Sequence, residues 1–325
     1  MSFYPVKFEP ILKETLWGGN KLKNFYNKQT DLPLVGESWE ISGVNGNVSI
    51  ISNGHFKGLK LTELLKRNPV EVLGRKVADR FGNEFPLLIK FIDARENLSV
   101  QVHPNDELAD KRHKNSFGKT EMWYILQTLP EAKLVLGFDK VLDREKYIKK
   151  SQNGTIEDVL NYKEIAPGEA FLIPAGLVHA IGAGIVLIEV QQTSDITYRI
   201  YDYKRKDKNG SFRKLHISES IEAIDFSAKA LEPPETKTSC GIKYIAECKY
   251  FSAELLDLNL IDENTELFKE IDSFVILVCF DGTADLKYKG GLERINKGES
   301  ILVPAILVNN ISLSGNAKLL KVYIR

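Results

Sequence analysis

Three short segments of the sequence carry residue types that bind metal ions or move protons. They are Gln101–Pro104, Gly118–Glu121 and Pro174–Ala180. Together they offer two imidazoles, one carboxylate and one amide, in stretches that read as strands or turns between strands. Imidazole nitrogen and carboxylate oxygen suit Zn²⁺, although Fe²⁺, Mn²⁺ or Co²⁺ could also bind. If the segments converge, they form a metal site of the catalytic kind, with one position open to substrate or water.

The local patterns allow four of these side chains to reach one ion. Along the strand Leu98–His103, side chains alternate, so Gln101 and His103 share one face. Glu121 opens an apolar strand, and His179 follows a Pro-Ala-Gly turn that can hold an imidazole still. A lone histidine on a strand is more often a core residue than a ligand. Here the four residue types occur together, which favours the metal site.

Charged residues lie near these segments in the sequence. Lys119 stands two residues before the carboxylate, where it could bind an anion or act as a base. Glu189 belongs to a polar row on one face of an otherwise apolar strand, and Arg199 could enter the same cavity from the next strand. The alternative, a surface arginine paired with a surface glutamate, is left open. Lys204 is close enough to Arg199 to be a phosphate ligand.

The elements that must position these residues are mostly short strands, with fewer helices. This content predicts an all-β barrel or sandwich that carries a small helical part. The predicted strands are Leu87–Ile92, Leu98–Val102, Met122–Leu126, Lys133–Phe138, Ala170–Ile173, Ile185–Val190 and Phe274–Phe280. The predicted helices are Leu61–Leu65 continuing into Val70–Phe81, Asn105–Arg112, Arg144–Leu160 and Ser218–Ile224.

The chain contains an internal repeat. Ile165–Pro174 aligns without a gap on Ile295–Pro304, at an offset of 130 residues (165 to 295). In each copy a Gly-Glu turn precedes a four-residue apolar strand that ends at proline. The same offset places His179 on Asn309. The repeat therefore predicts a duplicated barrel in which only the first copy keeps a residue that binds metal.

The repeat also suggests a division into two domains. We expect a catalytic domain over residues 1–232, with a helical insertion near 56–82, and a second, degenerate domain over 236–325. The proline pair in Glu232–Glu235 makes this segment the best linker, because it cannot continue a helix or a central strand.

The composition excludes several classes of partner. The 325 residues contain 44 basic and 44 acidic side chains, so no overall charge favours nucleic acid or a membrane surface. No signal peptide or membrane-spanning run is apparent. Three cysteines without paired spacing fit a reduced, cytoplasmic setting. The balanced charge and a self-covering second barrel favour a monomer.

Three further motifs complete a family pattern. They are Trp17-Gly18-Gly19, Gly36–Glu40, and Gln191–Arg199 followed by Tyr201-Asp202-Tyr203. With the three segments above, they make the chain resemble type I mannose-6-phosphate isomerases (phosphomannose isomerases) in their short bacterial form. The resemblance covers nearly the whole length. The six motifs together are highly specific, whereas any one alone would be weak.

The resemblance implies a fold, a cofactor and an activity. The fold is mainly β: a duplicated cupin (jelly-roll β-barrel) with the helical part reduced to roughly 56–82. The cofactor is one Zn²⁺ per chain, and the activity is interconversion of mannose 6-phosphate and fructose 6-phosphate through an enediol. The resemblance matches Gln101, His103, Glu121 and His179 to the zinc ligands, Arg199 to the active-site arginine, and Glu189 and Lys119 to further cavity residues. We expect Arg199, Glu189 and Lys119 to be catalytic, and Lys204 and Trp17 to bind substrate.

Other functions stay open at this point. The chain could be a metal cupin that acts on another sugar phosphate, or an oxygenase that holds Fe²⁺. It could also be a non-catalytic sugar-binding or regulatory cupin, although a pure binder has no need of an open metal position. Within the isomerase hypothesis, the proton could be relayed by either Glu189 or Lys119. Arg199 and the zinc would then stabilise the developing negative charge.

Overall fold

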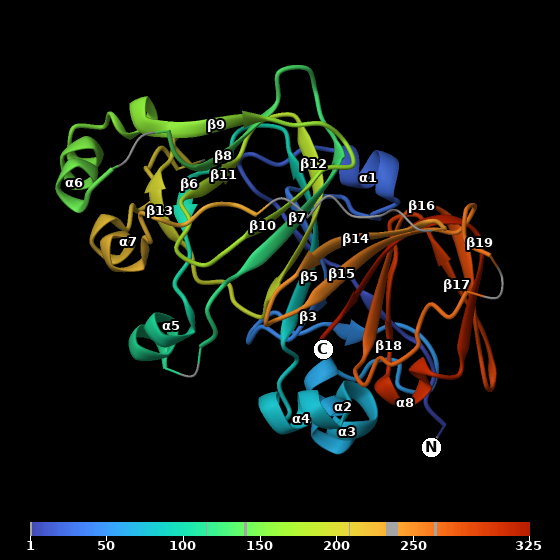
Figure 1. Ribbon diagram of the computed structural model, residues 1–325. Coiled ribbons are helices and arrows are strands. Elements are labelled where there is room, and N and C mark those ends of the chain that lie inside the picture. The colour runs from blue at the N-terminus through green and yellow to red at the C-terminus, as the bar shows by residue number, and fades with distance from the viewer. Residues whose placement is uncertain (1, 115, 140–141, 208, 232–239, 263–264) are drawn as a thin grey trace.

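Two antiparallel sheets form the first barrel of the protein (Figure 1). The computed structural model describes residues 2–114, 116–139, 142–207, 209–231, 240–262 and 265–325. The six-stranded sheet has the order β10-β7-β12-β5-β3-β2, and the five-stranded sheet has the order β13-β6-β11-β8-β9. The strands are β2 Ile11–Lys13, β3 Glu37–Ser42, β5 Leu87–Ala94, β6 Val100–Val102, β7 Glu121–Gln127, β8 Lys133–Phe138, β9 Leu160–Glu164, β10 Ala170–Ile173, β11 His179–Ile181, β12 Ile185–Gln192 and β13 Tyr198–Tyr201.

The apolar core of this barrel lies between the two sheets. Every residue of the central strands β5 and β12 is buried, as their long apolar runs require. Trp123 and Leu187 of one sheet pack with Leu134 and Ile181 of the other in a single cluster. The seven predicted strands are all present, with ends that shift by up to two residues in most cases and with a longer last strand.

A third, eight-stranded sheet forms the second barrel. Its order is β14-β15-β19-β16-β18-β1-β4, with β17 paired to β16. Its apolar core is a separate cluster that includes Leu256, Leu277 and Leu319. The strands are β1 Val6–Glu9, β4 Ile50–Ile51, β14 Ile242–Glu247, β15 Ser252–Asp257, β16 Val275–Tyr288, β17 Gly291–Asn296, β18 Ser300–Val303 and β19 Ile311–Tyr323.

The expected domain division stays a prediction. Its linker, Glu232–Glu235, lies outside the residues that the structure describes. The N-terminal strand β1 pairs with β18, so the first residues of the chain complete the last sheet.

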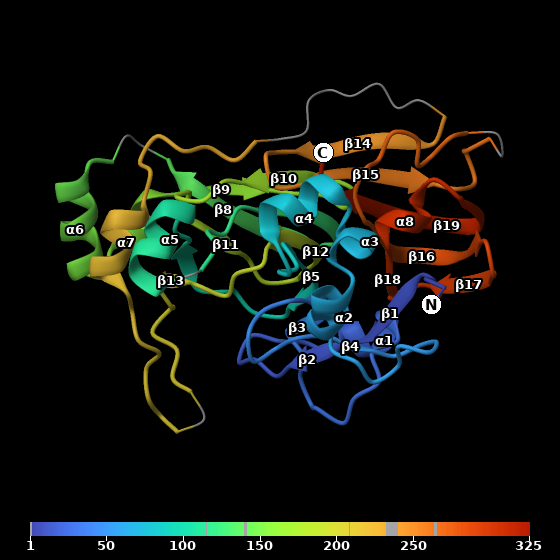
Figure 2. The same cartoon turned by 90° about the horizontal axis from the view of Figure 1, so that it is seen from below.

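The helices lie at the periphery. Helices α2 Leu61–Arg67, α3 Pro69–Leu73 and α4 Arg75–Phe81 form one group, in the range expected for the insertion. Helices α6 Arg144–Gln152 and α7 Ile217–Ala223 lie at the end of the first barrel away from the eight-stranded sheet, and α5 Asp106–His113 lies nearer to that sheet than they do (Figures 1 and 2). Two further helices are α1 Lys21–Tyr26 and α8 Ala305–Val308. None of the described helices is both long and apolar enough to cross a membrane.

Two predicted helices are wrong in length. The expected helix Val70–Phe81 is split, because Gly74 has a φ of 87° that a helix cannot contain. The expected helix Arg144–Leu160 ends at Gln152, since Gly154 also has a positive φ. A single 3₁₀ turn and strand β9 follow it.

The internal repeat is present in the fold. Strands β10 and β18 occupy residues 170–173 and 300–303, positions that differ by the predicted offset. Opposite the last residue of β10 stands Glu121, whereas Val275 stands opposite the last residue of β18. Val275 is fully buried in the second apolar core. The second barrel therefore has a valine where the first has a candidate metal ligand.

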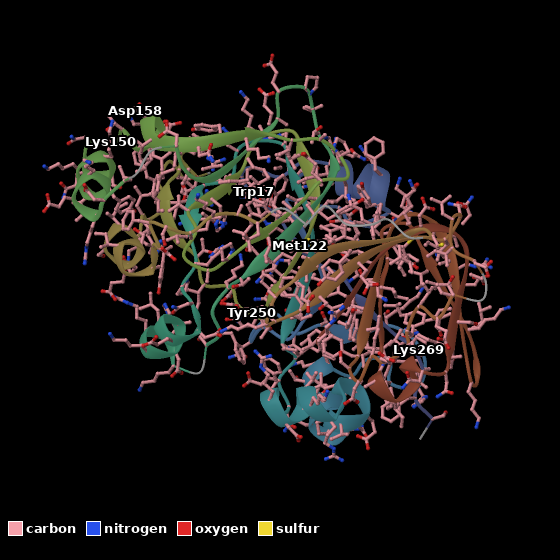
Figure 3. The ribbon with its side chains drawn as sticks, viewed as in Figure 1. Trp17, Met122, Lys150, Asp158, Tyr250 and Lys269 are labelled. Carbon is pink, nitrogen blue, oxygen red and sulfur yellow. The ribbon has the colours of Figure 1, made fainter. Side chains whose placement is uncertain are left out.

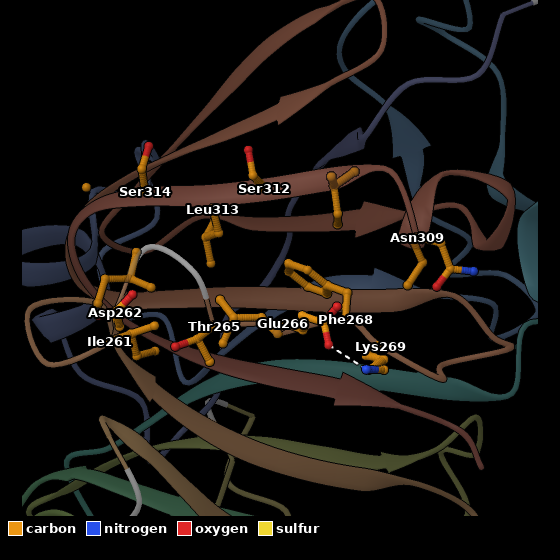
Figure 4. Close-up of a pocket in the computed structure, with 15 residues that line it drawn as sticks. Ile261, Asp262, Thr265, Glu266, Phe268, Lys269, Asn309, Ser312, Leu313 and Ser314 are labelled. Atoms are coloured by element: carbon orange, nitrogen blue, oxygen red, sulfur yellow. Dashed lines mark hydrogen bonds and ion pairs between the residues drawn. The ribbon is translucent and has the colours of Figure 1, made fainter.

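The two copies diverge after the shared proline. In the first copy Gly176 has a φ of 90°, which lets the chain turn sharply into β11. The same offset places Ile306 there in the second copy, and a β-branched residue does not adopt that conformation. The chain forms helix α8 instead, and Asn309 is an exposed residue at its end. Asn309 lines a cavity of about 570 Å³ with Phe268 and Leu313 (Figure 4).

Candidate metal centre

The three segments singled out in the sequence are joined by hydrogen bonds. The backbone N–H of Gly176 donates to the carbonyl oxygen of His103 (2.9 Å). The backbone N–H of Lys119 donates to the carbonyl oxygen of Pro104 (3.1 Å). The N–H of Ala175 donates to Oγ1 of Thr120 (3.3 Å). Each segment is thus fixed to another, as convergence on one site requires.

Two imidazoles and one carboxylate meet at the centre of this arrangement. The Nε2 atoms of His103 and His179 are 3.2 Å apart. Glu121 places Oε2 3.5 Å from Nε2 of His103 and Oε1 3.3 Å from Nε2 of His179. All three side chains are buried. Within the part of the chain that the structure describes, these three side chains lie close enough together to hold one metal ion.

Backbone carbonyls fix the orientation of both imidazoles. Nδ1 of His103 donates to the carbonyl oxygen of Ile196 (2.9 Å), and Nδ1 of His179 donates to that of Leu177 (2.8 Å). Burial lowers the pKa of His103 well below its usual value and that of His179 to about 4. Both rings are therefore neutral at pH 7, and each directs the lone pair of Nε2 into the cluster.

These atoms fit a metal ion. Two lone pairs and a carboxylate facing one another repel unless a cation lies between them. In a tetrahedral zinc site with bonds of about 2.0–2.1 Å, ligand atoms lie about 3.3 Å apart, as they do here. Burial and the neighbouring Glu189 raise the pKa of Glu121 to about 7, which a cation at the cluster would reverse. The amide nitrogen of Gln101 lies 3.3 Å from Nε2 of His179, and the same amide turned by 180° would present its oxygen as a ligand.

Lys119 lies directly beside the cluster. Its Nζ is 2.9 Å from Oε2 of Glu121 and 3.1 Å from Nε2 of His103. The side chain is only 5% exposed, so its charge acts with little screening by water. The cation that the sequence predicted beside the candidate metal site therefore lies within hydrogen-bonding distance of two of its side chains.

Glu189 lies on the same inner face but makes different contacts. Its Oε1 accepts a hydrogen bond from Lys90 (2.8 Å), and its Oε2 accepts one from the Trp123 indole (2.9 Å). Burial favours the neutral acid, but the charges of Lys90 and Lys119 and the hydrogen bonds from Lys90 and Trp123 together outweigh it and lower the pKa of Glu189 to about 2. A carboxylate with two donors and such a pKa is better suited to balancing charge than to relaying a proton.

The sequence interpretation missed Lys90, although a signal was present. A lysine in the middle of the otherwise apolar strand Leu87–Ile92 is unusual, because burying an ammonium group requires a partner. Lys90 is paired across the sheet with Glu189 on one side and Trp39 on the other. Its Nζ also lies 3.5 Å from Glu37, within the Gly36–Glu40 motif.

Arg199 reaches the same face of the barrel from β13. It pairs with Gln101 of β6, which in turn pairs with His179 of β11. Cross-strand partners point to the same side of a sheet, so Arg199 points to the same side as Gln101 and His179. One guanidinium nitrogen, Nη1, donates to the carbonyl oxygen of Lys214 (2.9 Å), and its buried Nε has no hydrogen-bond partner among the described residues.

The two predicted substrate-binding residues lie apart from the cluster. Lys204 is exposed, in a left-handed backbone conformation with a φ of 53°. Nearby Asp202 accepts hydrogen bonds from Arg205 (2.6 Å) and Arg213 (2.7 Å), which leaves an excess of positive charge around Arg199.

Trp17 is only 5% exposed and packs with the apolar core of the first barrel (Figure 3).

The sequence of the chain is similar to that of known enzymes. Residues 6–124 match the catalytic domain of type I phosphomannose isomerase, and residues 241–324 match the cupin domain of mannose-6-phosphate isomerase. The chain is 34% identical to mannose-6-phosphate isomerase ManA of Bacillus subtilis over 313 residues, 94% of each protein. It belongs to the type I phosphomannose isomerase family. The family resemblance, the cupin fold and the expectation of an isomerase are confirmed.

Other relatives agree with this membership of the phosphomannose isomerase family. A mannose-6-phosphate isomerase of Streptococcus mutans is 35% identical over 74% of this chain and 73% of its own length. The crystal structure of the Bacillus subtilis mannose 6-phosphate isomerase superposes with a TM-score of 0.88 at 30% identity, covering 99% of this chain and all of the other. A zinc-bound mannose 6-phosphate isomerase, 19% identical, shares the fold with a TM-score of 0.78.

The second copy of the repeat has Asn309 at the position of His179, and this difference suggests a variant of the candidate metal centre. His179→Asn introduces the residue that stands at position 309, and we expect it to lower zinc affinity by at least about 100-fold, since it removes one of few ligands. Zinc per chain is measured after dialysis against a chelator of known affinity. His113→Asn, an exposed histidine outside the cluster, is the control. Unchanged zinc content in His179→Asn would contradict the assignment of this ligand.

Proposed function

We propose that this chain is a zinc-dependent aldose–ketose isomerase that interconverts mannose 6-phosphate and fructose 6-phosphate. The observation that carries the proposal is the buried His103–Glu121–His179 cluster with Lys119 beside it. Membership of the phosphomannose isomerase family, whose relatives are named as mannose-6-phosphate isomerases, supports the choice of substrate.

Four residues would hold the metal: Gln101, His103, Glu121 and His179. Bound there, zinc supplies a Lewis acid that polarises substrate oxygens. The chain itself supplies the rigidity. Both histidines are held by backbone carbonyls, and Gln101 and His179 are paired across neighbouring strands. Ligands fixed in this way keep their geometry while substrate enters and leaves.

The isomerisation moves a proton between C2 and C1 and develops negative charge on oxygen. Lys119 is our choice for the group that holds the moving proton, because it lies at the cluster, whereas both oxygens of Glu189 are occupied. Arg199, on the same side of its sheet as Gln101 and His179, would stabilise negative charge, and its Nε has no acceptor among the described residues. Lys204 and Trp17 stay predicted substrate-binding residues.

One assay tests this function. Mannose 6-phosphate turnover is coupled to detection of fructose 6-phosphate before chelation, after chelation, and after stepwise return of zinc. We expect activity to be lost on chelation and restored at one zinc per chain. Turnover that survives complete removal of metal would refute the metal dependence. A zinc-loaded chain that ignores mannose 6-phosphate but converts another sugar phosphate would refute the substrate.

Further properties extend the proposal. The substrate is a small sugar phosphate, as the named activity of the relatives implies. A monomer and a cytoplasmic location stay predictions from the balanced charge and from three cysteines that form no disulfide in the structure.

A further inference from the structure

Asp106, the first residue of α5, connects the second barrel to the loop that carries Lys119 and Glu121. Its Oδ2 accepts a hydrogen bond from the hydroxyl of Tyr250 (2.6 Å). Its Oδ1 accepts two more, from the backbone N–H of Gly118 (3.0 Å) and from Nε2 of Gln192 (2.8 Å). Lys249 also approaches it, at 3.5 Å, but that side chain is largely exposed.

The hydrogen bonds of Asp106 and Gln192 also hold the backbone of the loop Gly118–Glu121. Oε1 of Gln192 accepts a hydrogen bond from the N–H of Thr120 (2.9 Å), and the N–H of Gly118 donates to Asp106 itself. Two of the three residues that precede Glu121 are therefore fixed through one carboxylate. The third, Lys119, donates its N–H to the carbonyl oxygen of Pro104.

The backbone of the loop at residue 118 packs so closely against the start of α5 that only glycine fits at this position. A Cβ atom there would lie 2.6 Å from backbone atoms of Asn105 and Asp106. Because backbone atoms cannot move aside as a flexible side chain can, a small shift of Asp106 would displace the loop with it. The position of Lys119 and Glu121 is thus tied to that of Asp106.

Tyr250, which donates to Asp106 from the second barrel, is itself held in place. It lies in the turn between β14 and β15 of the second barrel and is 8% exposed (Figure 3). Nη1 of Arg80 donates to the carbonyl oxygen of the preceding residue, Lys249 (2.8 Å), which anchors the turn to helix α4. The hydroxyl therefore presents a fixed donor to Asp106 rather than a mobile one.

We propose that Tyr250 is a positioning residue for the active site, acting through Asp106 and Gln192 on the loop Gly118–Glu121. The second barrel, which lacks the candidate ligands of the first, thereby sets the placement of Lys119 and Glu121. The inference rests on the proposed function, because it assigns those two residues to the metal and the proton. A hydrogen bond to a carboxylate is among the stronger kinds, and groups that orient metal ligands typically affect affinity or activity by 10–100-fold.

The test compares two tyrosines of the second barrel that each donate to a carboxylate. Tyr250→Phe is expected to lower kcat and zinc affinity by about 10-fold each, with little change in KM. The control is Tyr323→Phe, in which a similarly buried tyrosine loses its bond to Glu254 (2.7 Å) within the same sheet. It is expected to cost similar stability but to leave kcat and zinc affinity unchanged. Equal effects of the two variants on kcat and zinc affinity would overturn the proposal.

A double-mutant cycle tests the route. In an Asp106→Ala background, Tyr250→Phe should have no further effect on zinc affinity, because its partner is absent. Asp106→Leu, which has nearly the shape of aspartate and no acceptor, replaces Ala if that variant does not fold. Additive losses would show that Tyr250 acts by another route and would overturn the proposal. Zinc affinity is measured by competition with a chelator, so this outcome is read independently of whether the chain isomerises mannose 6-phosphate.

Discussion

Lys119→Met is expected to lower kcat for mannose 6-phosphate by about 10³-fold, within the range typical of a general acid–base group, while zinc binding is retained. Methionine has a similar length and no charge. The ammonium group of Lys119 lies 2.9 Å from Glu121 and 3.1 Å from His103, so its loss acts at the cluster itself. Removing a cation beside the ligands also removes a repulsion, so zinc affinity should not fall.

The measurement needs kinetics and metal content on the same samples. Lys111→Met, on the exposed surface of α5, is the matched control and should behave as the wild type. A kcat for Lys119→Met within tenfold of the wild type would rule out its role in proton transfer. Glu189→Gln would then become the decisive variant, because Glu189 is the remaining candidate.

The second large effect concerns stability. Lys90→Met or Glu189→Gln alone is expected to lower the free energy of unfolding by about 3–5 kcal/mol, because each leaves one buried charge without its nearest partner. Both side chains are less than a tenth exposed, and the two charged atoms lie 2.8 Å apart. The combined variant should be more stable than either single one, since no unpaired charge remains. Urea unfolding of the zinc-loaded proteins measures all four species.

The same pair predicts a dependence on pH. The pKa of Glu189 is lowered from its ordinary 4.5 to about 2, so its contribution to stability is complete above pH 4.5. It is lost as the pH falls from 4.5 towards 2. In that range the combined Lys90→Met, Glu189→Gln variant should lose less stability than the wild type. Equal losses in the two proteins would mean that the pair is not ionised in the folded state.

The sequence pointed to the residues of the candidate metal cluster because their signals are local. Alternation along one strand places Gln101 and His103 on the same face, and the repeat shows that His179 follows a strand end. The alternation around Gln101 survives folding because β6 buries Val100 and Val102 on its other side. The convergence of the three segments is not encoded in any one of them, since it depends on hydrogen bonds between distant turns, such as that from Gly176 to His103.

Other features depended on tertiary partners and were not predicted. The pairing of Lys90 with Glu189 joins residues nearly a hundred positions apart, and neither strand alone identifies the other as its partner. The different turn after Pro174 and Pro304 follows from Gly176 in one copy and Ile306 in the other. The link from Tyr250 to Asp106 crosses between barrels and has no sequence signature.

The pairing of the first strand has a consequence for the order in which the chain can fold during synthesis. The second half of β1 pairs with β4, but its first half pairs with β18, so that Val6 faces Leu302. Those N-terminal residues leave the ribosome early and must wait for almost the whole chain before their partner strand emerges. Until then, part of an edge strand stays open to pairing with other chains. The second sheet can therefore be completed only after β18 has been synthesised, long after β1.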